Sequence, residues 1–118
     1  MAKRKDEGFK APVTEKSIFS LMGLSMRQGA VESGSFLAEK SIKAGTAKLV
    51  VIAEDASDNT KKLFGDKCAF YKIPVISLGT KAELGHSIGK EFRASLAILD
   101  KGFAEAVMKK IESISQAQ

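Results

Sequence analysis

The run that begins at Gly34 has the composition of an anion-binding helix start. Glycine and serine precede a helical pattern, and Lys40 follows one turn into it. Gly34 allows a backbone conformation that is costly for other residues and lets the main chain approach a phosphate closely. We expect Ser35 to cap the helix, whose N-terminal N–H groups attract anions, and Lys40 to neutralise a phosphate held there. Lys43 is a further candidate, and a solvated lysine is the ordinary alternative for both.

A second candidate segment is the turn 89–93, which reads Gly-Lys-Glu-Phe-Arg. Phe92 lies between charged neighbours, where an exposed ring can stack on an unpaired base and contribute about 1–3 kcal/mol. Arg93 could add a phosphate contact or stack itself, and Lys90 and Glu91 belong to the same turn. The alternative is that Phe92 begins the following strand and turns inward.

No group of residues has the spacing of a catalytic site. The run 85–90 has one residue too few between its glycines for a Walker loop, lacks Ser or Thr after Lys90, and does not follow a strand. His86 and Ser87 are neighbours in sequence, which does not make them a base and a nucleophile. Cys68 lies on an apolar helical stripe, which favours a packed side chain over a reactive thiol. We therefore expect no enzymatic activity and no small-molecule substrate.

Metal and cofactor sites are not expected either. One cysteine and one histidine are too few for an ordinary structural zinc site, and a single cysteine excludes an internal disulfide. Asp55, Asp58 and Asp66 do not share the spacing of a metal cage, and helix capping or solvent exposure explains them.

The bulk composition is that of one basic domain. The chain has 118 residues and a net charge of +5, which makes a polyanionic partner plausible. No apolar run approaches the roughly 20 residues that span a membrane. Residues 1–13 are rich in charge and lack periodicity, so we expect a flexible basic arm before a single domain at 14–118. No signal peptide is recognisable, and the cytoplasm is the expected compartment.

Helical patterns alternate with short strands along the rest of the chain. Expected helix starts are Thr14, Ser35, Ser57 or Asp58, Thr80, and the turn 100–102. Gly29, Gly45 and Pro74 should end the first three helices. The expected inward-facing side chains are Ile18, Leu21, Met22, Ser25 and Met26; Ala38 and Ile42; Leu63, Phe64, Cys68, Phe70 and Tyr71; Leu84 and Ile88; and Phe103, Val107, Ile111 and Ile114.

After a short extended piece at 30–33, strands are expected at 48–53, 75–78 and 94–99. The uniformly apolar run within 48–53 predicts a central strand covered on both faces. This alternation predicts an α/β fold, a three-layer α-β-α sandwich around a mixed or parallel sheet of about four strands. Ligands of such sheets lie beyond the strand ends, where loops and helix N-termini converge.

The run 34–55, together with Lys61, Lys62, Pro74 and the run 84–90, resembles the kink-turn RNA-binding ribosomal-protein superfamily. Within it the chain is most similar to the small bacterial YlxQ-type proteins, over roughly 17–107. The resemblance implies that the helix after Gly34 meets the loop 89–93 to form an RNA site. Structured RNA, such as a kink-turn or bulged duplex of ribosomal or regulatory RNA, would then be the partner.

Two positions depart from the pattern of that superfamily. Its archaeal-type members carry Asn and Glu where this chain has Phe36 and Leu37, and these groups bind the guanines of tandem sheared G·A pairs. We expect Leu37 to lie partly in the core and Phe36 to make apolar contact at the RNA surface. Direct base readout is therefore in doubt, whereas positioning on the phosphate backbone is not.

The sequence thus predicts a non-enzymatic RNA-binding module. The expected RNA-binding residues are Gly34, Ser35, Phe36, Leu37, Lys40, Lys43, Lys90, Glu91, Phe92 and Arg93. Alternatives are a protein-interaction domain that has kept the fold and lost the RNA site, and a recognition domain detached from an RNA-modifying enzyme. A basic face joining Lys40, Lys43 and Arg93 would favour RNA, and an apolar patch there would favour a protein partner.

Overall fold

A computed structural model describes residues 15–116 of the chain. The elements are α1 (Glu15–Arg27), β1 (Val31–Ser33), α2 (Ser35–Ala44), β2 (Leu49–Ile52), α3 (Asp58–Tyr71), β3 (Val75–Ser77), α4 (Lys81–Ser87), β4 (Ser95–Ile98) and α5 (Lys101–Gln116). The predicted arm at 1–13 and the predicted cap Thr14 lie outside the described residues.

The four strands form one mixed sheet in the order β1-β4-β2-β3. β2 runs parallel to β3 and antiparallel to β4, and β4 is also antiparallel to β1. Every residue of β2 and β4 is buried, because these interior strands have a helical layer on each face. The prediction of a buried central strand within 48–53 is confirmed.

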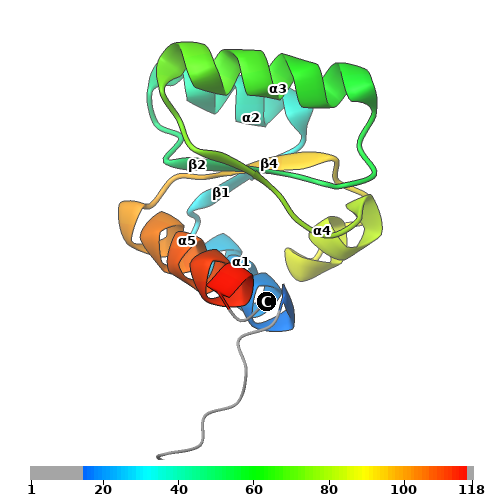
Figure 1. Cartoon of the computed structure of the whole chain (residues 1–118), viewed down its shortest axis with the longest axis vertical. Helices are drawn as coiled ribbons and strands as arrows, with labels where there is room; N and C mark the ends of the chain where they lie inside the picture. Colours follow the sequence, from blue (N-terminus) through cyan, green and yellow to red (C-terminus); the bar gives the residue numbers. More distant parts are fainter. Residues whose placement is uncertain (1–14, 117–118) are drawn as a thin grey trace, which may run out of the picture.

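The helices form the two outer layers of a sandwich. Figure 1 shows α2 and α3 over one face of the sheet and α1, α4 and α5 under the other. The buried side chains between the layers form one hydrophobic core, with Phe64 its largest fully buried member. The predicted three-layer α-β-α architecture is therefore confirmed.

Local sequence signals set most of the helix ends. Gly45 ends α2 in the left-handed conformation, with φ of 79°. Ser57 caps α3 by accepting a hydrogen bond from the Thr60 N–H. Thr80 and Glu83 form the predicted capping box of α4, in which each side chain accepts a backbone N–H of the other residue.

The predicted apolar stripe of α3 is only partly correct. Phe64 and Cys68 are buried, but Leu63, Phe70 and Tyr71 are exposed. The 14 residues of α3 extend about 21 Å at 1.5 Å per residue. The strands beneath, four residues in β2 and three in β3, extend only about 10–13 Å at 3.3 Å per residue. Part of α3 therefore extends beyond the strands. Phe70 also lies about 200° around the helix axis from the buried Cys68, so its side chain points away from the sheet.

Candidate nucleic-acid interface

The N-terminus of α2 has no side-chain cap. Gly34 is the N-cap residue with φ of 92°, a conformation that side chains disfavour, and its carbonyl accepts the first helical hydrogen bond from Ala38. The first turn holds no acidic residue. The N–H groups of residues 35–37 thus have no helical carbonyl to bind, which leaves the positive end of the helix dipole open to an anion.

Ser35 does not have the predicted capping role. It is the first residue inside the helix, and its Oγ lies 3.2 Å from Oγ of the buried Ser95 at the start of β4. The Gly34 N–H also donates to the Ser95 carbonyl, with an N–O distance of 2.9 Å. The cap prediction was wrong because the partner of Ser35 is 60 positions away in sequence.

The loop 89–93 reaches the same edge of the sheet, as the family resemblance implied. The Arg93 Nε donates to Ser33 Oγ, immediately before Gly34, over 3.4 Å. A second guanidinium nitrogen of Arg93 donates to the Phe92 carbonyl over 2.8 Å. The start of α2 and the loop before β4 are therefore joined through Ser33, Arg93 and Ser95.

A glycine inside α4 holds this loop, a role that sequence reasoning missed. A Cβ added at Gly85 would lie 1.3 Å from the Glu91 carbonyl oxygen. The Lys90 N–H donates to the Gly85 carbonyl over 2.8 Å, and the Arg93 N–H donates to the Lys81 carbonyl over 3.0 Å. A glycine in the middle of a helical pattern was the available signal, because it often marks close backbone approach.

Two phenylalanines are presented to solvent in these segments. Phe36 is 77% exposed and Phe92 is 69% exposed, so the inward orientation considered for Phe92 is excluded. Phe92 forms one wall of a hollow of about 510 Å³, which also contains His86, Lys90 and Glu91. Leu37 is 40% exposed and lies outside the hydrophobic core, contrary to its predicted partial burial in the core.

The charges near α2 do not form a continuous basic face. Lys40 is exposed and has no ion pair with any described residue. Lys43 lies 3.5 Å from Glu39, whose carboxylate also lies 3.4 Å from Lys67. Arg93 is partly buried and hydrogen-bonded. The surface combines exposed aromatic rings with a few cations. It is therefore neither the continuous basic face expected for RNA nor the apolar patch expected for a protein partner.

Other residues considered for chemistry have structural partners. Ser87 donates to the Leu84 carbonyl rather than to His86, and Asp55 accepts the Lys81 N–H at the start of α4. Cys68 is 1% exposed, and burial raises the pKa of its thiol to about 11. Within residues 15–116, no cluster of three metal-ligating side chains occurs. None of the helices described is both long and apolar enough to cross a bilayer.

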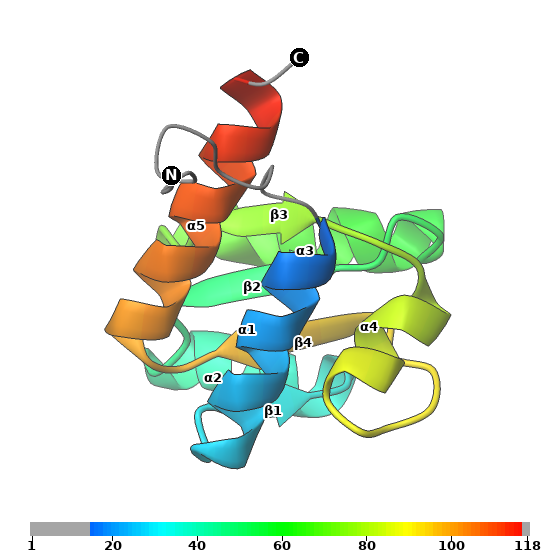
Figure 2. The ribbon, with the colours of Figure 1, turned by 90° about the horizontal axis from the view of Figure 1, so that it is seen from below.

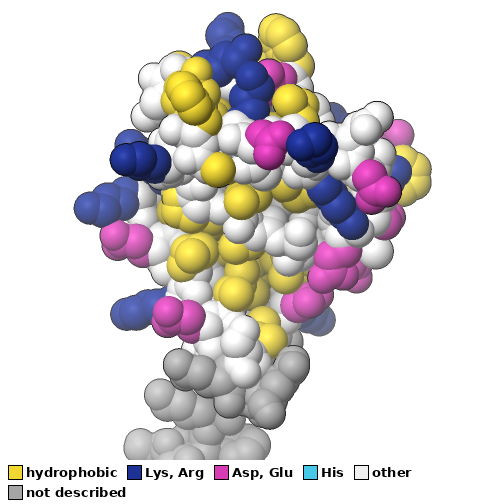
Figure 3. Space-filling view, turned by 45° about the horizontal axis from the view of Figure 1, so that its top comes forward, with side chains coloured by type: hydrophobic (Ala, Val, Ile, Leu, Met, Phe, Trp, Pro, Cys, Tyr) yellow, Lys and Arg dark blue, Asp and Glu magenta, His cyan; other side chains and the backbone are white. Residues whose placement is uncertain are grey.

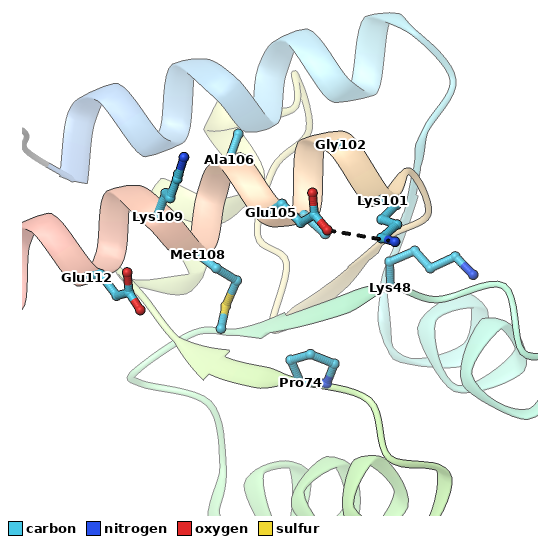
Figure 4. Close-up of a pocket in the computed structure, with 10 residues that line it drawn as sticks. Lys48, Pro74, Lys101, Gly102, Glu105, Ala106, Met108, Lys109 and Glu112 are labelled. Atoms are coloured by element: carbon cyan, nitrogen blue, oxygen red, sulfur yellow. Dashed lines mark ion pairs between the residues drawn. The ribbon is translucent and has the colours of Figure 1, made fainter.

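Another hollow, of about 930 Å³, lies away from this edge, between α5 and the start of β3. Figure 3 shows hydrophobic side chains across the middle of the face formed by α3 and the β3 edge, with charged side chains around them. In Figure 4, Met108 points from α5 toward Pro74, while Lys101 pairs with Glu105 at 4.0 Å. We assign no chemistry to this groove.

The chain is similar to a known protein family and to named relatives over most of its length. Residues 16–108 match the model of the ribosomal protein L7Ae/L30e/S12e/Gadd45 family. The chain is 45% identical to the RNA-binding protein YlxQ of Bacillus subtilis, over 80% of this chain and 94% of that protein. It is 35% identical to the large ribosomal subunit protein eL8 of Picrophilus torridus, over 89% of this chain and 84% of that protein.

A solved structure shares the fold. The structure of a protein with unknown function from Bacillus halodurans C superimposes with a TM-score of 0.78, at 35% identity, over 80% of this chain and 96% of that one. The family match covers most of the chain, including α2, α4 and the loop between α4 and β4. This protein therefore belongs to the ribosomal protein L7Ae/L30e/S12e/Gadd45 family.

Proposed function

We propose that this protein is a non-enzymatic RNA-binding protein that engages structured, kinked or bulged RNA. The observation that carries the proposal is the uncapped N-terminus of α2 beside the exposed Phe92 ring, joined through Ser33, Arg93 and Ser95. Its similarity to the RNA-binding protein YlxQ and to the large ribosomal subunit protein eL8 supports the proposal.

Each part of the surface has a distinct role in this proposal. The N–H groups at 35–37 bind a phosphate oxygen, and Gly34 lets the backbone come close. Lys40 neutralises that phosphate, with Lys43 and Lys90 as weaker contributors, since Lys43 is shared with Glu39. Phe92 stacks on a nucleotide that is not base-paired, and an unpaired base is needed because stacked duplex bases leave no free face.

Phe36 and Leu37 give the surface an apolar character. Neither side chain can donate or accept the hydrogen bonds that read purine edges. Recognition then relies on RNA shape, backbone contacts and stacking, and a kink-turn or another bulged element of ribosomal or regulatory RNA supplies that shape. We place the protein in the cytoplasm together with such an RNA.

A protein-interaction module is the second candidate. It is favoured by the exposure of Phe36 and Leu37 and by the pairing of Lys43 with Glu39, which together make part of the α2 surface apolar and weakly charged. Phosphate contact distinguishes the two functions, because RNA binding releases counterions and weakens as salt rises.

The test is a salt titration of binding to a kinked RNA and to an unkinked duplex of equal length. Lys40→Ala should weaken binding to every bound RNA and lower the slope of log affinity against log salt by about one unit. Lys109→Ala is the matched control, because Lys109 is also an exposed helical lysine but lies on α5. If Lys40→Ala binds like the parent throughout, the α2 site is wrong. If the parent binds neither RNA, the protein-interaction function replaces the proposal.

A further inference from the structure

A third hollow lies between α1 and α4. It has a volume of about 460 Å³, and its lining includes Lys16, Phe19, Arg27, Glu83 and His86. The two helices are close here, since a Cβ added at Gly23 of α1 would lie 2.7 Å from the Ser87 carbonyl oxygen of α4. Figure 2 shows α4 beside α1, with the loop that follows α4 on the same side of the molecule.

This hollow has an excess of positive charge. Lys16 and Arg27 are exposed and have no ion pair with any residue in the described range. Its acidic member, Glu83, accepts the Thr80 N–H in the capping box of α4, so part of its charge is already compensated. Lys16 and Arg27 are 11 positions apart on α1, about 16 Å at 1.5 Å per residue, so the cations lie along a strip.

The strip is continuous with the surface proposed to bind RNA. Glu83 and His86 line both this hollow and the one walled by Phe92. A chain of phosphates that passes Phe92 can therefore cross α4 at His86 and reach α1 without leaving the molecular surface. Phe19 is the one large apolar side chain in the lining, and it packs against the core, so an apolar peptide has little to anchor it.

We propose that this hollow between α1 and α4, called the groove below, binds the RNA backbone of the stem that leaves the bulge. Lys16 and Arg27 are its phosphate contacts. This proposal rests on the proposed function, because it extends the same RNA-binding surface. The affinity of the protein for RNA would then depend on the length of this stem as well as on the bulge. A sequence-independent contact of this kind contributes affinity and orientation, not base specificity.

The experiment compares three RNAs with the same bulge. One has two short stems, and each of the other two has a different stem extended. The parent protein should bind one extended RNA about tenfold more tightly than the short one, through the added phosphate contacts. Lys16→Ala with Arg27→Ala should remove this gain, lower the salt slope on that RNA by up to about two units, and leave affinity for the short RNA unchanged. Melting temperatures establish that the variants are folded.

The control is Lys101→Ala with Lys109→Ala, which removes the same charge from α5. The groove proposal is overturned if stem extension brings no gain, if the control loses as much as the test variant, or if the test variant loses equally on short and extended RNA. It is also overturned if Lys16→Ala with Arg27→Ala weakens binding to a polyglutamate peptide but not to RNA. That result would assign the groove to an acidic protein segment. Failure of the parent to bind any RNA would instead refute the proposed function.

Discussion

Phe36 is 77% exposed and Phe92 is 69% exposed, although burial of an aromatic ring is a large source of stability. Neither ring contributes much to the core, so its place on the surface is available for binding. Ser35 shows the opposite case, because its hydroxyl is directed to Ser95 and not to the helix end. The charged neighbours of Phe92 favoured its exposure without excluding an inward orientation, whereas the Ser35 contact required the fold.

At the level of single residues, we predict that Phe92→Ala weakens binding to a bulged RNA by about 1–3 kcal/mol, the usual contribution of one base stacked on one aromatic ring. Binding to plain duplex should be nearly unchanged. Phe70→Ala is the control, because Phe70 is 78% exposed at the far end of α3. Titrations with both RNAs test this. Equal losses on both RNAs, or a marked fall in melting temperature, would identify a structural role for Phe92.

A second residue-level prediction concerns Phe36→Asn combined with Leu37→Glu. The new side chains supply hydrogen-bonding groups for purine edges, so discrimination for tandem sheared G·A pairs over a disrupted control should rise by about 1–3 kcal/mol. The fold should tolerate both changes because Phe36 and Leu37 are exposed, which a melting curve verifies. A folded double variant without improved discrimination would mean that this face of α2 does not contact the RNA bases.

Among the elements, α2 could be placed from sequence alone and the loop 89–93 could not. The bounds of α2 follow from Gly34 and Gly45, which both have positive φ beside a helical pattern. The position of the loop depends on Gly85, where the α4 backbone meets the Glu91 carbonyl. The predicted apolar stripe of α3 was too wide, because Phe70 lies about 200° around the helix axis from the buried Cys68.

The element-level prediction is that Gly85→Ala disrupts the loop. The added Cβ overlaps the Glu91 carbonyl oxygen, a backbone atom that cannot rotate away, so the loop must move and carry Phe92 with it. We expect a lower melting temperature together with weaker binding to bulged RNA. Gly65→Ala is the control, because a Cβ there meets no atom within 4 Å, and helix propensity predicts a gain of up to about 1 kcal/mol. A stable Gly85→Ala variant with parental affinity would contradict the assigned role of Gly85.

For the whole molecule, the sheet with two helical layers separates the hydrophobic core from the edge proposed for RNA. Periodicity predicted this architecture well, because the uniformly apolar run that became β2 requires cover on both faces and helical patterns alternate with the strands. Charge was less informative. The net charge of +5 gave no indication that Glu39 would lie within ion-pair distance of both Lys43 and Lys67. Such pairings depend on how α2 packs against α3, which composition does not encode.

The prediction at this scale concerns global stability at high pH. Burial raises the pKa of the Cys68 thiol from 9.0 to about 11. Because the folded-state pKa is the higher one, the thiol's contribution is complete below about pH 9 and is lost as the pH rises through about 11. In this window the unfolded state ionises while the native state stays neutral, which costs up to about 1.4 kcal/mol per pH unit.

The measurement is the free energy of unfolding in urea between pH 8 and pH 11 for the parent and for Cys68→Ala. At pH 8 the parent should be the more stable, since the alanine leaves unfilled space beside Phe64 in the core. The difference in unfolding free energy should then narrow as the pH rises, because only the parent has a thiol to ionise on unfolding, and every other titratable group is the same in both proteins. A difference that stays constant over this range would mean that the thiol is not held in its neutral form by the core, and that the layers around α3 admit water.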